Sequence, residues 1–295
     1  MLQLLQLIVG GAAIGCIYAL IALGFVLIYK ATETVNFAQG DLMMVSGFIG
    51  LTAMTVIGLP FAMAFVFTIV AMALIGMGTE RLVLRPLLGQ PAFTVVMMTI
   101  GLGYLARGLV TMIPYWGTET HTLPVPYKDE VIWLGGPNGL VLSVEHLVII
   151  VATIALVALL YVFFRYTRLG IAMQATSQNQ LAAFYMGIPV RRVNMLIWGL
   201  SSAICGVAGL LLAPITFVHA NMGFVGLKAF PAAVVGGFGS IPGALVGGLV
   251  IGIVESLAGF YLPEGFKDIA AYVVVLVMLV VKPNGLFGDN LAKKV

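Results

Sequence analysis

The sequence predicts an all-α fold, a polytopic bundle of transmembrane helices, on three observations. Of the 295 residues, 61% are hydrophobic and only 8% are charged, whereas soluble domains carry about 25% charged residues. Apolar runs of about 20 residues, the length that crosses a bilayer core of about 30 Å, recur along the chain. Lys and Arg gather in alternate connecting segments, as they do in multi-pass membrane proteins. We therefore expect one transmembrane domain over residues 1–295.

About eight spans are expected, each an apolar run bounded by charge or proline. They lie near residues 4–29, 41–58, 61–79, 92–113, 146–164, 194–217, 242–260 and 268–281. The first run is far longer than the core of a signal peptide, so we expect it to be a retained span. A shorter apolar piece at 227–237 is expected to be a half-helix or a steeply placed short span.

The distribution of positive charge predicts the orientation of these spans. One set of helix ends holds most of the basic residues: Lys30, Arg81, Arg85, Arg165, Arg168, Arg191, Arg192, Lys282, Lys293 and Lys294. The opposite set holds Lys128 and Lys267, with Lys228 at its edge. Because basic loops stay in the cytoplasm, the N-terminus is expected outside and the C-terminus inside. This parity requires the piece at 227–237 to bring the chain most of the way back across.

Two connecting segments are long enough to have a function of their own. The outer one, 114–145, contains Tyr115, Trp116, Tyr127 and Trp133 among prolines and acidic residues. It is interpreted either as an aromatic belt at the membrane interface or as a docking surface for an extracytoplasmic partner. The inner one, 165–192, contains a short amphipathic helix.

The apolar residues of that inner helix are Leu181, Phe184, Tyr185 and Ile188, at helical spacing. Thr176 or Ser177 is expected to cap the helix, and Gly187 followed by Pro189 is expected to end it. The helix either lies on the inner leaflet, held by flanking arginines, or inserts its apolar ridge into a groove of a cytoplasmic partner.

A polar patch precedes the second span, and its members are Asn36, Phe37, Gln39, Gly40 and Asp41. Asp41 is expected either to cap the helix that follows and to interact with its dipole, or to line a translocation path together with its neighbours. Broken helices can line such a path because their freed backbone groups face a cavity instead of lipid.

A glycine-rich run follows the short apolar piece. Gly239, Gly243, Gly247, Gly248 and Gly252 include four-residue spacings that allow close helix packing. Close packing is the plainer interpretation. The GFGSIPG sequence also predicts a helix break between Leu227 and Ala244, and Gly237, Gly239 and Pro242 are candidates for a turn that lines the path.

Two charged residues fall inside predicted spans, Arg107 and Glu255. Each can reach the headgroups from the outer end of its span, or the two can pair with each other. No other buried pair of fixed charges, and no mid-membrane carboxylate or histidine, is evident. This pattern is compatible with a zwitterionic apolar substrate and argues against a proton-coupled carrier.

Three segments resemble the branched-chain amino acid (LivH-type) permeases, which are membrane subunits of binding-protein-dependent ABC importers. Tyr29 to Gly50 is similar to their N-F-A-[HQ]-G-[DE] signature, and Pro231 to Glu255 is similar to their Gly-rich region. The inner segment resembles the coupling segment that docks on the ATPase, and the matching residues are Arg168, Gly170, Ala175, Asn179, Ala182, Ala183, Met186, Gly187 and Ile188. Many members have an acidic residue near 178–179, where this chain has Gln178 and Asn179.

The resemblance implies inward transport of branched-chain or related amino acids in a bacterial inner membrane. It implies four kinds of contact: a second homologous permease, two cytoplasmic ABC ATPases, a periplasmic substrate-binding protein and the lipid bilayer. A ribose-type sugar permease, an amide or urea permease, and a stand-alone secondary transporter or channel are the alternatives.

Catalysis by this chain is not expected. There is no Walker A motif, so no cofactor is expected in this chain and ATP would be bound by partner subunits. The G-x-G-x-x-A at Gly101, Gly103 and Ala106 lies inside a span, which is the wrong context for a dinucleotide site. His121, His146 and His219 lack metal-ligand spacing, and a formal charge of +3 is too small to suggest a nucleic-acid partner.

Overall fold

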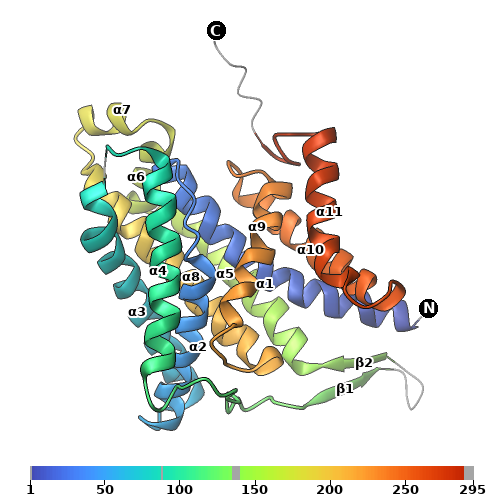
Figure 1. Cartoon of the computed structure of the whole chain (residues 1–295). Coiled ribbons are helices and arrows are strands. Elements are labelled where there is room, and N and C mark those ends of the chain that lie inside the picture. Colours follow the sequence, from blue (N-terminus) through green and yellow to red (C-terminus); the bar gives the residue numbers. More distant parts are fainter. Residues whose placement is uncertain (1, 88, 135–139, 289–295) are drawn as a thin grey trace.

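The structure, a computed structural model, describes residues 2–87, 89–134 and 140–288. In this part of the chain eleven α-helices form a bundle, and a single β-hairpin is the only sheet (Figure 1). The all-α class predicted from composition is confirmed.

The helices that correspond to the predicted apolar runs begin and end within four residues of the expected positions. They are α1 (Leu2–Thr32), α2 (Gln39–Thr55), α3 (Phe61–Thr79), α4 (Ala92–Met112), α5 (Val144–Tyr166), α8 (Val190–Thr216), α9 (Val225–Gly236), α10 (Ile241–Tyr261) and α11 (Phe266–Val281). The inner segment forms α6 (Arg168–Gln178) and α7 (Gln180–Tyr185). Short helical turns, Glu80–Leu84, Arg85–Leu87 and Met222–Phe224, extend α3 and precede α9.

Helix length confirms the multi-pass character of the chain. Among the described residues, six helices are long and apolar enough to cross a membrane: α1, α3 with its extension, α4, α5, α8 and α10. Helices α2 and α11 have 17 and 16 residues, which is short of a full crossing at 1.5 Å per residue. The count of eight spans stays a prediction.

Helices α1 and α8 form the centre of the bundle. The most apolar stretch of α1 is 89% buried and that of α8 is 78% buried, against 17% to 22% for α3, α4 and α5. Since α3, α4 and α5 have a mean hydropathy of 2.3, 1.6 and 3.0 over these stretches, their exposed faces are suited to lipid rather than to water.

Small residues let the central helices approach closely, as the glycine run predicted. A Cβ added to Gly252 of α10 would lie 2.3 Å from the Cα of Gly15 in α1. On the opposite face of α10, a Cβ on Gly247 would lie 2.1 Å from the carbonyl oxygen of Ala232 in α9. Helix α10 is therefore wedged between α1 and α9 by backbone contact.

The two ends of the bundle differ in structure and charge. Helices α6 and α7 lie at one end, and the hairpin of β1 (Val131–Leu134) and β2 (Leu140–Ser143) lies at the other (Figure 1); these are called the α6–α7 end and the hairpin end. Loop 114–145 was predicted without strands, but β1 and β2 pair antiparallel within it. The helix termini that carry Lys30, Arg165 and Lys282 all lie at the α6–α7 end. Lys293 and Lys294 lie outside the described residues.

Candidate functional site

Helix α2 begins inside the bundle and not at its edge. Residues 33–38 are not helical and turn back from the end of α1 (Figure 1). Gln39, the first residue of α2, donates from Nε2 to Ser201 Oγ at 2.8 Å, and Ser201 Oγ donates to the Gly24 carbonyl at 3.0 Å. Gly24 lies two turns before the end of α1, which is about 12 Å along the helix axis. The polar patch of the sequence is therefore a re-entrant segment.

A second half-helix starts at the same place. Helix α9 has 12 residues, or about 18 Å, roughly half of a bilayer core. A Cβ on Gly226 in its first turn would lie 2.3 Å from the Cα of Gly40 in the first turn of α2. The N-terminal turns of α2 and α9 thus touch within the bundle. We call this contact, residues 36–41 with 222–226, the half-helix junction.

The amides of the junction are satisfied within the chain. Ala38 N donates to Asn36 Oδ1 at 3.1 Å, and Asn36 Nδ2 donates to Gln39 Oε1 at 3.0 Å. Both amide side chains are fully buried. The Phe37 N–H donates to Thr99 Oγ1 at 3.2 Å. In this conformation these groups stabilise the non-helical backbone, and their role in lining a path stays a prediction.

Asp41 pairs with an arginine instead of capping its helix. No side chain caps α2, so the predicted capping role is wrong. Arg107 Nη2 donates to Asp41 Oδ1 at 2.7 Å, and the guanidinium lies 4.3 Å from the centre of the Phe224 ring. The Asp41 carboxylate also packs directly against two glycines. A Cβ added to Gly103 or to Gly223 would lie 2.4 Å from one of the carboxylate oxygens. The ion pair joins α2, the C-terminal half of α4 and the turn before α9.

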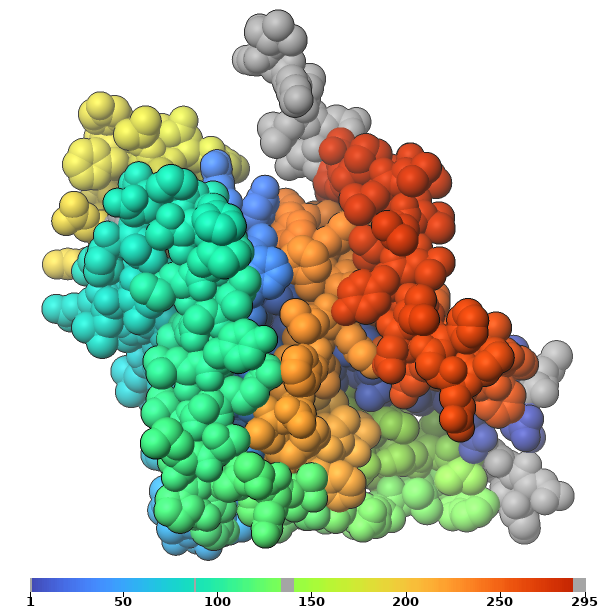
Figure 2. Space-filling model, viewed as in Figure 1, coloured from blue at the N-terminus to red at the C-terminus, as the bar shows by residue number. Residues whose placement is uncertain are grey.

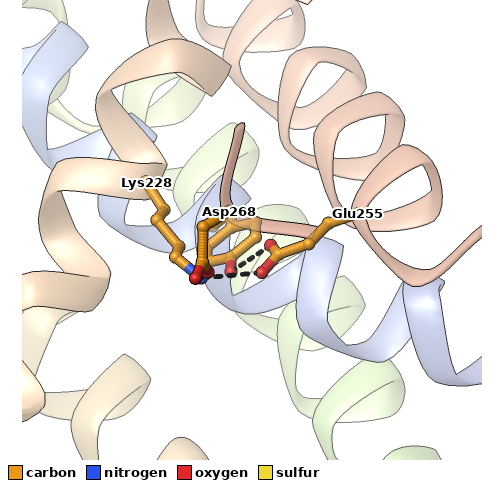
Figure 3. Close-up of polar contacts among 4 residues, drawn as sticks. Lys228, Glu255 and Asp268 are labelled. Carbon is orange, nitrogen blue, oxygen red and sulfur yellow. Dashed lines mark hydrogen bonds and ion pairs between the residues drawn. The ribbon is translucent and has the colours of Figure 1, made fainter. Parts of the chain in front are cut away.

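The predicted pair between Arg107 and Glu255 is wrong, because each has another partner. Glu255 accepts hydrogen bonds from Tyr18 and from Lys228, the latter at 2.8 Å, and Lys228 also donates to Asp268 at 2.6 Å (Figure 3). The expectation that no further buried pair of fixed charges exists is wrong as well, because Asp41 pairs with Arg107 and Glu255 pairs with Lys228. Tertiary contacts bring together acids and bases from helices far apart in sequence, and sequence spacing cannot show such pairs.

The glycine-rich turn lies at the other end of α9, away from the junction. Gly237 ends α9 with φ +99°, which favours glycine. Ser240 Oγ accepts from Gly243 N at 3.1 Å and caps α10, and Pro242 stands in its first turn. Gly239 has open space at its Cβ position. The predicted helix break is confirmed, and path lining by Gly237, Gly239 and Pro242 stays a prediction.

The inner segment forms two helices separated by Asn179. Thr167 caps α6, and its hydroxyl accepts a hydrogen bond from Gly170 N. The first turn of α6 contains Arg168 and Gly170, and Gly170 packs against the Phe163 carbonyl. The Asn179 N–H donates a hydrogen bond to the Ala175 carbonyl, and Asn179 Oδ1 accepts one from Ala182 N at 2.9 Å. The cap of α7 is therefore Asn179, and the expectation of Thr176 or Ser177 is wrong.

The end of α7 confirms the predicted glycine stop. Gly187 has φ +83°, its N–H donates to the Phe184 carbonyl, and the Ile188 N–H donates to the Ala183 carbonyl, both at 3.0 Å. This pair of bonds is a Schellman motif. Three members of the predicted ridge, Leu181, Phe184 and Tyr185, are 63% to 82% exposed, and Met186 beside them is 83% exposed. The fourth predicted member, Ile188, is instead partly buried against the core.

Several residues of these sites escaped sequence reasoning. Ser201 and Thr99 sit in apolar helices with no motif around them, and Lys228 was counted only as loop charge. In the sequence, Gly103 belongs only to a nucleotide-binding motif in the wrong context, and Gly226 belongs to no motif. A glycine that faces a carboxylate across helices leaves no mark in sequence spacing. In the described residues, no group of three His, Cys, Asp or Glu side chains could hold a metal.

Comparison with known proteins places the chain in a family. Residues 7–282 match the model of the family described as "Branched-chain amino acid transport system / permease component". The chain is 31% identical to the high-affinity branched-chain amino acid transport system permease protein LivH of Escherichia coli K12, covering 100% of this chain and 98% of LivH. It is 30% identical to BraD of Pseudomonas aeruginosa, covering 99% and 98%.

Weaker similarities extend beyond these relatives. The fructose import permease protein FruG of Bifidobacterium longum is 26% identical over 62% of this chain and 57% of its own length. Among solved structures, PsaBC from Streptococcus pneumoniae in complex with Fab is 17% identical with a TM-score of 0.46, covering 94% of this chain and 88% of that one. On the full-length matches, the chain belongs to the family of permease components of branched-chain amino acid transport systems.

Proposed function

We propose that this chain is the membrane subunit of an ABC importer that moves branched-chain or related amino acids into the cell. It pairs with a second homologous permease, two cytoplasmic ATPases bind the α6–α7 end, and a periplasmic binding protein delivers substrate to the hairpin end. The names of the full-length relatives support the substrate class. The basic residues at the α6–α7 end support a cytoplasmic position for that end, with the N-terminus outside and the C-terminus inside.

The observation that carries this proposal is the apolar ridge of α7. Leu181, Phe184 and Tyr185 are 70%, 63% and 82% exposed on a helix that lies beyond the ends of the long helices (Figure 1, and yellow at the upper left of Figure 2). The N-cap at Asn179 and the Schellman motif at Gly187 hold this short helix in place. A rigid helix with an exposed apolar ridge is suited to a groove on a partner protein. A helix lying on the inner leaflet is the competing interpretation.

The experiment is uptake by proteoliposomes that hold this chain, its partner permease and the candidate ATPases. Leucine uptake is expected to require ATP and the binding protein. Phe184→Ala is expected to lower the amount of ATPase that copurifies with the permease at least fivefold. Phe67→Ala, on the lipid-facing side of α3 and 44% exposed, is the matched control and is expected to leave it unchanged. Uptake that is indifferent to ATP contradicts the ABC proposal and supports a stand-alone transporter.

A sugar importer is the second candidate, because FruG shares part of this sequence. The same proteoliposomes separate the two, since uptake of fructose or ribose in place of leucine contradicts the amino acid assignment.

A further inference from the structure

A cavity of about 350 Å³ lies between the helices near the hairpin end. Its walls come from α1, α5, α8, α10 and α11, in their halves toward the hairpin end, and from the first turn of α9. Ligand pockets in proteins typically measure about 300 to 1,000 Å³ and combine an apolar lining with a few placed polar groups. This cavity has both.

The polar side of the cavity is a set of charged groups that the half-helix junction does not use. Glu255 is 3% exposed and accepts from Tyr18 and Lys228 (Figure 3). Lys228 and Lys267 line the same space, and so does His146. Ionisable residues inside a membrane bundle are costly, and they are retained mainly where they bind or conduct something.

The arrangement of these charges leaves capacity for a ligand. Each carboxylate oxygen can accept two hydrogen bonds, whereas Glu255 accepts one from Tyr18 and one from Lys228. The second partner of Lys228, Asp268, has a side chain that is 69% exposed. Lys228 can therefore release Glu255 and keep a charged partner.

The remaining wall is mainly aliphatic, with the hydroxyl side chains of Thr216 and Ser256 among its residues. Ile14, Leu212, Ile215 and Val225 face the cavity together with Gly10 and Gly252. A branched aliphatic side chain placed against this wall would be removed from water, which favours its binding.

We propose that this cavity is a binding site for the zwitterionic form of an aliphatic amino acid. The ammonium group binds the Glu255 carboxylate in place of Lys228, the carboxylate group binds Lys228 and Lys267, and the side chain packs on the aliphatic wall. The proposal rests on the amino acid transport proposed above, and it adds a substrate site within a single permease subunit.

The test is equilibrium binding of radiolabelled L-leucine to the full chain in nanodiscs, without the binding protein. Leucine is expected to bind saturably and to be displaced by unlabelled leucine. It is expected to be displaced at least tenfold less well by 4-methylpentanoate, which lacks the ammonium group, and by leucinamide, which lacks the carboxylate. Glu255→Gln keeps an acceptor for Tyr18 and is expected to weaken leucine binding at least tenfold while leaving 4-methylpentanoate unchanged.

Two further variants separate binding from folding. Phe67→Ala, on the exposed side of α3 and outside the cavity lining, is the control and is expected to change leucine affinity less than twofold. Val225→Phe fills the aliphatic part of the cavity and changes no charged residue. It is expected to abolish leucine binding while the protein keeps its elution volume in size-exclusion chromatography. Equal affinity for leucine and both analogues, or leucine binding unaffected by both Glu255→Gln and Val225→Phe, overturns the proposal.

Failure here is distinguishable from failure of the importer assignment. If the complete assembly imports leucine with ATP and Glu255→Gln imports it at the wild-type rate and KM, the cavity site is wrong and the importer stands. If no ATP-dependent leucine uptake occurs in the wild type, the importer assignment is wrong.

Discussion

The Asp41 carboxylate and the Arg107 guanidinium lie 2.7 Å apart, at the point where α2 begins inside the bundle. Their side chains are only 12% and 19% exposed. The pair links the first turn of α2 to the C-terminal half of α4, and Phe224, just before α9, packs on the guanidinium. The ion pair therefore helps to position both half-helices, together with the hydrogen bonds of Asn36 and Gln39.

Removing one charge of this pair is expected to destabilise the permease more than removing both charges. Asp41→Asn leaves Arg107 buried without a counter-charge, at a cost of about 3–5 kcal/mol. The double variant Asp41→Asn with Arg107→Gln removes both charges, and it is expected to recover at least half of the lost thermal stability. Thermal stability is measured by fluorescence-detected size exclusion in detergent. If the double variant loses as much stability as Asp41→Asn and Arg107→Gln lose in sum, the two residues are not coupled and the prediction is wrong.

The close contact between the half-helices is expected to tolerate no side chain. In Gly40→Ala the new Cβ would lie 2.1 Å from the Gly223 carbonyl oxygen, a backbone atom that cannot move alone. Overpacking of this kind costs about 1–3 kcal/mol or more, so the folded yield is expected to fall severalfold. Gly101→Ala is the control, because nothing lies within 4 Å of its Cβ position, and its yield is expected to match wild type. Equal yields for both variants would rule out the tight junction.

Helix α7 is expected to depend on its two ends. Asn179→Ala removes the side chain that accepts from Ala182 N, a loss of about 0.5–2 kcal/mol, whereas Asn179→Asp keeps an equivalent cap. Gly187→Ala places a β-carbon at φ +83°, which costs about 1–2 kcal/mol. We expect Asn179→Ala and Gly187→Ala to speed proteolytic cleavage between 179 and 188, and Asn179→Asp to leave it unchanged. Cleavage rates that do not differ among the three would show that the caps do not stabilise α7.

The two ends of the bundle are expected on opposite sides of the membrane. Trp133 at the hairpin end is 58% exposed and Leu181 at the α6–α7 end is 70% exposed, while the native Cys16 and Cys205 are buried. In intact cells, a membrane-impermeant maleimide is expected to label Trp133→Cys only. Leu181→Cys is expected to react after the membrane is opened. The reverse pattern would invert the proposed orientation.

Most helices could be predicted from the sequence because bilayer thickness and backbone hydrogen bonding leave few options for an apolar segment. A run of about 20 apolar residues must be helical in lipid, so the boundaries of α1, α4 and α10 followed from composition. Local backbone rules were equally readable. Gly187 before Pro189 predicted where a helix stops, and the GFGSIPG sequence predicted a helix break between Leu227 and Ala244.

By itself, the sequence determined the membrane class, the order of the helices, the gathering of basic residues at one end and the helix stop at Gly187. These follow from local hydrophobicity, local charge and backbone conformation. Only the tertiary structure decided that Asp41 meets Arg107, that Glu255 meets Lys228, and that Gly40 meets Gly226. Such pairs depend on how helices distant in sequence cross. In a membrane, where apolar faces all look alike to lipid, hydrophobic pattern alone does not select the neighbour.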